Sequence, residues 1–146
     1  MNPAPPAGSF SIVDALGSGL PHLLLQFLVT VALLVVGVTI YMTVTSFRER
    51  ELVAEGNVAA GVVLGGAVLG LAIPLAALLA TTSYLLDIIV WGVVALVIQL
   101  ITLGVVALML RRLRGMIEAG NVAAALILAA AQIAVALINA AAMVPT

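Results

Sequence analysis

The chain has 146 residues, of which 65% are hydrophobic and only 8% are charged, and its mean hydropathy is +1.38. Long apolar runs with so few charges are typical of transmembrane helices and argue against a soluble domain. Cysteine is absent and there is one histidine, so disulfides, thiolate chemistry and a zinc or haem centre are not expected. The net charge of −1 leaves no basic face for nucleic acid.

Four segments are long enough to cross a bilayer, which takes ~20 apolar residues. They are residues 20–45, 57–82, 83–110 and 121–143. Backbone polar groups in hydrocarbon must be paired within the protein, and these residues do not alternate as they would in a β-barrel. The sequence therefore predicts an all-α, polytopic membrane protein with four transmembrane helices and the lipid bilayer as its solvent.

Residues 1–19 precede the first span and contain no Lys or Arg. They lack the charged start of a signal peptide, so we expect them to stay on the mature protein as an outside segment. The stretch 10–20 has an apolar face. It is expected either to lie on the outer leaflet as an interfacial helix or to be disordered after the proline-rich start.

All five positive charges are arginines, and they lie in the loops after the first and third spans: Arg48, Arg50, Arg111, Arg112 and Arg114. The positive-inside rule places both loops in the cytoplasm. In a bacterial inner membrane, both termini and the short turn at residues 80–87 then lie outside, which is the periplasm of a Gram-negative cell.

The chain resembles itself after a shift of 64 residues. Residues 48–60 (RERELVAEGNVAA) and 112–124 (RLRGMIEAGNVAA) share two arginines and the run Gly-Asn-Val-Ala-Ala. This predicts a tandem, parallel repeat of a two-helix hairpin, with the first copy at 20–82 and the second at 83–146. Each copy has an even number of helices, so both insert in the same orientation. A pseudo-twofold axis along the membrane normal is expected to relate them.

Small residues recur in the second helix of each copy. They are Gly61, Gly65, Gly66 and Gly70 in the first copy, and Ala125, Ala129, Ala130 and Ala134 at the equivalent positions of the second. Consecutive residues turn by ~100°, so the pairs Gly61/Gly65 and Gly66/Gly70 lie on roughly opposite helix faces. Since small residues allow close helix packing, the second and fourth spans are expected to form the inner seam.

Each arginine loop ends in Gly-Asn. Asn57 and Asn121 are predicted N-caps of the helices that follow, and Glu55 and Glu118 lie just upstream, where the positive helix end favours a carboxylate. One interpretation is a turn into the membrane with local ion pairs. The alternative is a docking surface for a cytoplasmic partner or for anionic lipid headgroups.

This doubled unit, with its Arg/Glu loop, Gly-Asn turn and small-residue helix, resembles the domain-of-unknown-function 350 family, the YjfL-like bacterial inner-membrane proteins. The resemblance covers residues 23–142. It implies a small four-helix inner-membrane protein of uncharacterised function, and it supplies no catalytic residue.

Polar side chains inside a membrane are the first candidates for function. At 1.5 Å per residue, Gln99 and Gln132 lie roughly 16–18 Å from the cytoplasmic ends of their spans, near the midplane. An interhelical Gln–Gln hydrogen bond is one interpretation, and a small polar site is the other. Thr102 and Asn139 extend this pair as a candidate polar stripe.

No catalytic, cofactor or metal constellation is visible in the sequence, so we expect no enzyme and no cofactor. One functional hypothesis is an accessory or scaffold subunit that packs with itself or with other membrane proteins. The alternative is a homo-oligomeric channel or small transporter with a polar midplane site. A pore requires its polar groups to line one continuous path, whereas a scaffold requires them to be paired and dry.

Overall fold

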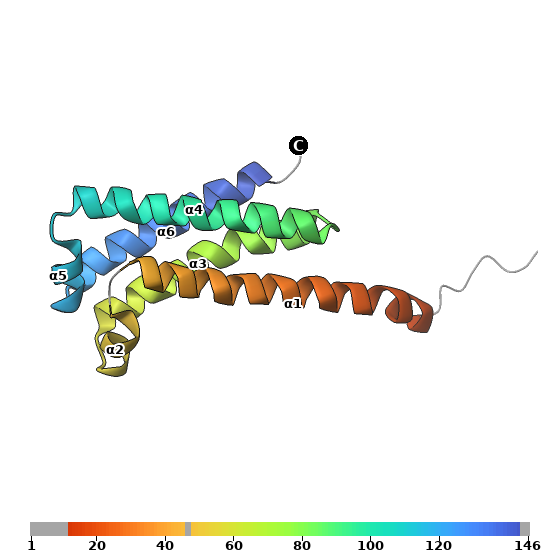
Figure 1. Ribbon diagram of the computed structural model, residues 1–146, viewed down its shortest axis with the longest axis horizontal. Helices are drawn as coiled ribbons and strands as arrows, with labels where there is room; N and C mark the ends of the chain where they lie inside the picture. Colours follow the sequence, from red (N-terminus) through yellow and green to blue (C-terminus); the bar gives the residue numbers. More distant parts are fainter. Residues whose placement is uncertain (1–11, 46–47, 144–146) are drawn as a thin grey trace, which may run out of the picture.

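The computed structural model describes residues 12–45 and 48–143, and this part of the chain is helical without any strand. Four long helices are apolar enough to cross a membrane: α1 (Ile12–Val44), α3 (Val58–Thr81), α4 (Leu85–Met109) and α6 (Val122–Met143). Two short helices, α2 (Glu49–Ala54) and α5 (Leu113–Glu118), lie at one end of the molecule (Figure 1). The predicted all-α fold with four spans is confirmed.

The first span differs most from its prediction. α1 begins at Ile12 and runs through Pro21, and its first turns project beyond the connection between α3 and α4 (Figure 1). The expectation of a disordered stretch, or of one separate from the first span, is therefore wrong for residues 12–20, while residues 10 and 11 lie outside the described part. A position of these residues at the outer leaflet stays a prediction. Pro21 removes only the N–H that would bond to the carbonyl of Gly17, and a long helix can continue across one lost bond.

α3 and α6 lie side by side and make the most extensive contact between helices (Figure 1). The buried positions of both helices are mostly small, among them Ala59, Gly66, Ala125 and Ala129. Small side chains let the two backbones approach and maximise van der Waals contact, which matters where lipid provides no hydrophobic drive between helices. The structure thus places the second and fourth spans at the centre. α1 exposes most of its large apolar side chains.

The two loops have the same local geometry at positions 64 apart. Gly56 and Gly120 have φ of 84° and 79°, a left-handed conformation that glycine adopts without a Cβ clash. Asn57 Oδ1 accepts from the backbone N–H of Ala60 at 3.0 Å, and Asn121 Oδ1 accepts from that of Ala124 at 3.1 Å. Both asparagines are therefore N-caps, as their sequence context predicts.

The halves are not arranged about a twofold axis, which corrects our expectation. A twofold axis would bury equivalent positions equally, yet Gly66 and Gly70 are buried while their equivalents Ala130 and Ala134 are exposed. α3 also packs against α4, whereas α1 and α6 make no contact of comparable extent. The reason is that α3 and α6 meet through different faces: an added Cβ at Gly66 would lie 2.7 Å from Cα of Ala129.

Candidate functional site

One chain of hydrogen bonds connects all four transmembrane helices. Gln99 donates from Nε2 to the backbone carbonyl of Gly70 at 3.0 Å and to that of Gln132 at 3.3 Å, which joins α4 to α3 and α6. Gln132 donates from its own Nε2 to the hydroxyl of Tyr41, which adds α1. These three side chains belong to residues that are 0% exposed, so the network is enclosed by protein.

The two amide oxygens of this network depend on glycine for space. Oε1 of Gln99 and Oε1 of Gln132 accept no hydrogen bond within the described residues. A Cβ at Gly66 would lie 3.0 Å from Oε1 of Gln132, and a Cβ at Gly70 would lie 3.0 Å from Oε1 of Gln99. The two amide groups therefore occupy the space beside Gly66 and Gly70 of α3, where a larger residue would place a side chain. The α3–α6 contact and the hydrogen-bond network are thus packed together.

The predicted pair Gln99 and Gln132 is thus brought together, but not amide to amide. Gln99 donates to the backbone carbonyl of Gln132, while the side chain of Gln132 donates to Tyr41. Thr102 is buried and donates to the carbonyl of Ile98 in its own helix at 2.9 Å. Asn139 is partly buried, and its Nδ2 has no acceptor among the described residues. The hydrogen bonds do not continue from the amides along the predicted polar stripe.

Several buried polar residues were not predicted from the sequence, among them Tyr41, Gln26 and Glu49; Thr30 and Thr45 are buried as well. Tyr41 was hidden by an apolar surrounding, although its hydroxyl needs a partner when buried. Gln26 interrupts a run of leucines and would have been found by the criterion applied to Gln99; it is 8% exposed and its Nε2 has no acceptor in the described part of the chain. Glu49 was passed over between two arginines, yet it is only 2% exposed.

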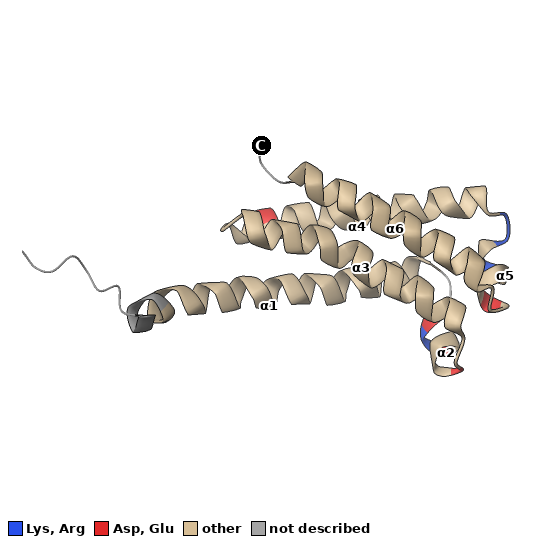
Figure 2. Cartoon of the chain, turned by 180° about the vertical axis from the view of Figure 1, so that it is seen from behind, with Lys and Arg blue, Asp and Glu red and all other residues tan. Residues whose placement is uncertain are grey.

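Charged side chains gather at the end of the molecule that carries α2 and α5 (Figure 2). Arg48 pairs with Glu51, and Arg114 Nε pairs with Glu118 at 2.8 Å. Glu55 forms no ion pair within the described residues; Arg48, the residue before α2, pairs instead with Glu51 in the first turn of that helix. The two pairs face a pocket of about 360 Å³ between α2 and α5, which is lined by Arg48, Glu51, Leu52, Glu55, Arg114 and Glu118.

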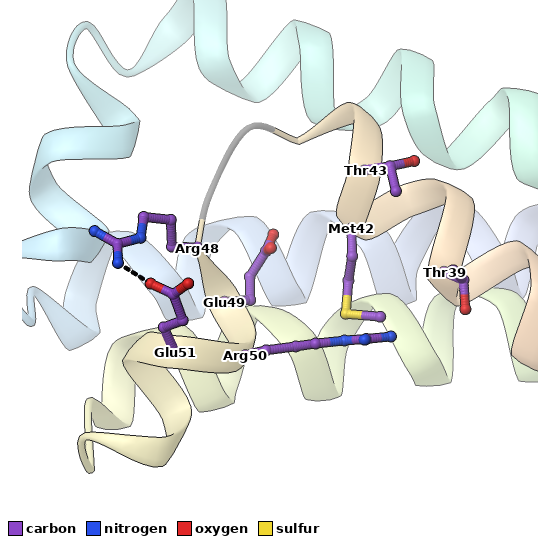
Figure 3. A pocket seen from close by; sticks show the side chains of 7 residues that line it. All are labelled: Thr39, Met42, Thr43, Arg48, Glu49, Arg50 and Glu51. Atoms are coloured by element: carbon purple, nitrogen blue, oxygen red, sulfur yellow. Dashed lines mark ion pairs between the residues drawn. The ribbon is translucent and has the colours of Figure 1, made fainter.

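The remaining arginines, Arg50, Arg111 and Arg112, are exposed and form no ion pair with any described residue. Arg50 extends along the end of α1 toward Met42 (Figure 3). It helps to line a second pocket of about 260 Å³ whose wall also includes Thr39 and Thr43 of α1. Exposed pairs and single arginines of this kind contribute little to stability and remain available to anionic groups.

Glu49 lies at the inner side of the second pocket (Figure 3). Burial raises the pKa of this carboxyl, and a hydrogen bond of 2.5 Å from the hydroxyl of Thr45 partly offsets the rise. The folded state therefore favours protonated Glu49. The stabilisation of the folded state that comes from protonated Glu49 is fully present below the pKa that Glu49 has in the unfolded chain. It is lost as the pH rises through the higher pKa that Glu49 has in the folded chain.

Glu49→Gln is expected to raise the Tm at pH 7.5, since the neutral amide keeps an acceptor for Thr45 and carries no charge to bury. The gain should shrink as pH falls below the pKa of Glu49. Thermal unfolding in detergent between pH 4 and 8 checks this. Glu55→Gln, at an exposed position without an ion pair, serves as the control and should show no such trend. A gain from Glu49→Gln that is independent of pH would contradict the expectation.

Asn57 joins the two loops to each other. Its Nδ2 donates to the backbone carbonyl of Ile117 at 3.0 Å and to that of Glu118 at 3.2 Å, at the end of α5. Those carbonyls belong to the last turn of a helix, where acceptors lack partners within the helix. Asn121, the equivalent residue, is exposed and forms no such bond to the described part of α2.

Comparisons with known proteins identify the family of this chain. The family described as Domain of Unknown Function (DUF350) matches residues 15–143. Two relatives are the UPF0719 inner membrane protein YjfL of Escherichia coli strain K12 and that of Escherichia coli O157:H7. Each is 33% identical over 117 residues, which cover 80% of this chain and 89% of the relative. No solved structure shows significant similarity to the chain. The family resemblance seen in the sequence is confirmed, and with its four membrane-spanning helices this chain belongs to the DUF350 family.

Proposed function

We propose that the protein is a scaffold or accessory subunit of the inner membrane, which packs with itself or with other membrane proteins through its helix faces. The observation that carries this is the state of the midplane amides. Gln99 and Gln132 are 0% exposed and bonded to protein, so they serve cohesion between helices. A water-filled path would need the same groups to be exposed along one line.

The surface supports the same proposal. α3 carries Gly61 and Gly65 on a side where an added Cβ would meet nothing within 4 Å. In lipid, such small positions favour association because another helix can approach closely there. Within the four candidate spans, residues 16–44, 58–81, 85–109 and 122–143, Asp87 is the one charged residue, and it lies in the first turn of α4, where Thr82 donates to it at 3.1 Å. No charge at the midplane marks an ion or proton path.

The proposal includes an orientation with the arginine loops in the cytoplasm, where Arg50, Arg111 and Arg112 can meet anionic headgroups or a partner protein. The natural chain has no cysteine, so single cysteines report position without background. Arg50→Cys should react with an impermeant maleimide only after the cells are permeabilised. Ser83→Cys, in the opposite turn, should react in intact spheroplasts. Labelling of position 50 from outside would reverse the orientation.

The function is tested by purifying the protein from its native membrane in mild detergent and identifying what travels with it by mass spectrometry. A membrane protein at fixed stoichiometry, or a homo-oligomer that conducts no ions in liposomes, supports the scaffold role. Solute or ion flux that Gln99→Leu abolishes while the fold persists would replace it with the channel. A monomer without partners would contradict it.

A further inference from the structure

The contact between α3 and α6 uses one face of each helix and leaves the other face of each unused. We define the front face as Ala59, Val63, Gly66 and Gly70 in α3, with Ala123, Ile127, Ala130 and Ala134 as its equivalents in α6. We define the back face as Ala125, Leu128, Ala129 and Gln132 in α6, with Gly61, Leu64, Gly65 and Val68 as its equivalents in α3. Inside the chain, the front face of α3 meets the back face of α6 at Gly66, where an added Cβ would contact Ala129 and Gln132, within the most extensive contact between helices. Gly70, at the end of this front face, lies against Gln99 of α4.

Burial follows this division at every position. The front face of α3 and the back face of α6 are buried throughout. The front face of α6 is exposed throughout, and the back face of α3 is exposed or only partly buried. Each chain therefore has a second front face, on α6, and a second back face, on α3. Neither takes part in the internal contact, so both are accessible to another molecule.

The free halves also fit each other in size. In the internal contact a glycine of the front face, Gly66, receives the methyl group of Ala129. At the free faces the sizes are exchanged, because Ala130 replaces the glycine and Gly65 replaces the alanine. The methyl group thus lies on the back face in the internal contact and on the front face in the proposed one. Each pair consists of one glycine and one alanine, so the combined side-chain volume is the same. A Cβ at Gly65 has no neighbour within 4 Å in the isolated chain, so the space that Ala130 needs is present.

The loops show the same relation. Asn57, at the start of α3, donates across the internal contact to the last turn of α5. Asn121 is its exposed equivalent, and the matching acceptors are the carbonyls of Val53 and Ala54, which are exposed residues in the last turn of α2. A polar donor and its acceptors thus accompany the free apolar faces at positions equivalent to those of the internal contact.

From these observations we infer that a second copy of this chain docks by repeating the internal contact, with the front face of α6 against the back face of α3 of the next copy. The inference rests on the proposed self-packing and specifies its interface. Such an interface is head-to-tail, so it closes into a ring when the rotation between copies permits. No inversion is needed, since α3 and α6 follow equivalent loops at the same end of the molecule (Figure 1).

The same arrangement covers α1. Internally, α4 packs against α3 beside the α3–α6 contact. The equivalent contact between copies places α1 of the next copy against α6. α1 is the least buried of the four long helices, with Val35 60% exposed where its equivalent Gln99 is 0% exposed. The docking therefore buries the helix that the single chain leaves most open.

Single cysteines test this geometry in membranes. Gly65→Cys and Ala130→Cys are placed in separately tagged chains and co-expressed, then treated with an oxidant. A covalent dimer that contains both tags is expected, and neither variant alone should give one. A chain with both cysteines should give a ladder of multimers. Ala54→Cys with Asn121→Cys repeats the test at the membrane edge, where the added side chains do not enter the seam.

A size-exchange experiment tests the same contact without cross-linking. Gly65→Ala should weaken the wild-type oligomer, so that the monomer fraction in native mass spectrometry rises, while the far-UV circular dichroism of the chain stays unchanged; a weakened contact of this kind can still be trapped by a disulfide. Gly65→Ala combined with Ala130→Gly should restore the oligomer, because the methyl group is again present on one side only.

Other outcomes overturn the inference in distinguishable ways. A cross-link in the Gly65→Cys chain alone means that like faces meet about a twofold axis. An oligomer that gives neither mixed cross-link keeps self-packing but moves the interface elsewhere. A wild-type monomer bound to a different membrane protein removes self-docking and leaves the accessory role, whereas a monomer without any partner removes both proposals.

Discussion

Gly66→Ala is expected to destabilise the fold by about 3 kcal/mol, at the upper end of typical overpacking costs. The added Cβ would lie 2.7 Å from both Cα and Cβ of Ala129. Because Cα of Ala129 belongs to the backbone, it cannot rotate away, and the clash is relieved only if α3 and α6 separate. That separation would also lengthen the hydrogen bonds of Gln99 and Gln132. Unfolding in a denaturing detergent, followed by circular dichroism under dilute monomeric conditions, measures the change.

The neighbouring glycine provides a matched control. Gly65→Ala adds the same methyl group one residue earlier, where nothing lies within 4 Å. In the single chain it should be neutral, or stabilising by up to about 1 kcal/mol through helix propensity. The variant that combines Gly66→Ala with Ala129→Gly should recover much of the lost stability. Equal effects of Gly65→Ala and Gly66→Ala would mean that the seam does not lie on the Gly66 side of α3.

Gln99→Leu is expected to destabilise the fold by about 2 kcal/mol, on the basis of roughly 0.6–1.7 kcal/mol for each interhelical hydrogen bond in a membrane. The substitution removes the donor that holds α4 to the backbones of Gly70 and Gln132. The same unfolding measurement applies. Leucine keeps most of the volume, so the loss reports the hydrogen bonds more than a cavity.

Thr102→Val is the appropriate comparison for Gln99→Leu. Thr102 lies in the same helix and is buried, but its hydroxyl bonds only to Ile98 within α4. It should cost less than about 1 kcal/mol because no contact between helices is lost. If both variants cost the same, the amide network would not hold the four helices together, and the strongest support for the scaffold proposal would be gone.

The parts of the fold that depend on local chemistry were predictable from the sequence. Four long apolar runs predict four helices, because only internal hydrogen bonding satisfies a backbone in lipid. The Gly-Asn pairs predict the loop geometry, since a left-handed glycine and an N-cap are decided within a few residues. Residues 12–20 were the exception: the sequence predicted a segment separate from the first span, but α1 begins at Ile12 and runs through Pro21.

The partners of the polar side chains were only half predictable. Depth along a helix follows from residue number, so Gln99 and Gln132 could be placed at one level. Their actual acceptors could not be predicted, because Tyr41 comes from a helix whose rotation depends on packing. Burial of Glu49 likewise depends on tertiary packing, because α2 contacts α3 and Glu49 accepts from Thr45 just beyond the end of α1. Figure 3 shows Glu49 between these segments.

The sequence by itself thus determined the number of helices, their capping loops and the family. It also marked α3 and α6 as the helices that others can approach closely. Only the tertiary structure decided which side of each helix is used. Gly61/Gly65 and Gly66/Gly70 are equally small, so no single-helix property distinguishes them. The choice arises because Gly66 and Gly70 also make room for two amides from α4 and α6, a requirement that exists only once the helices are assembled.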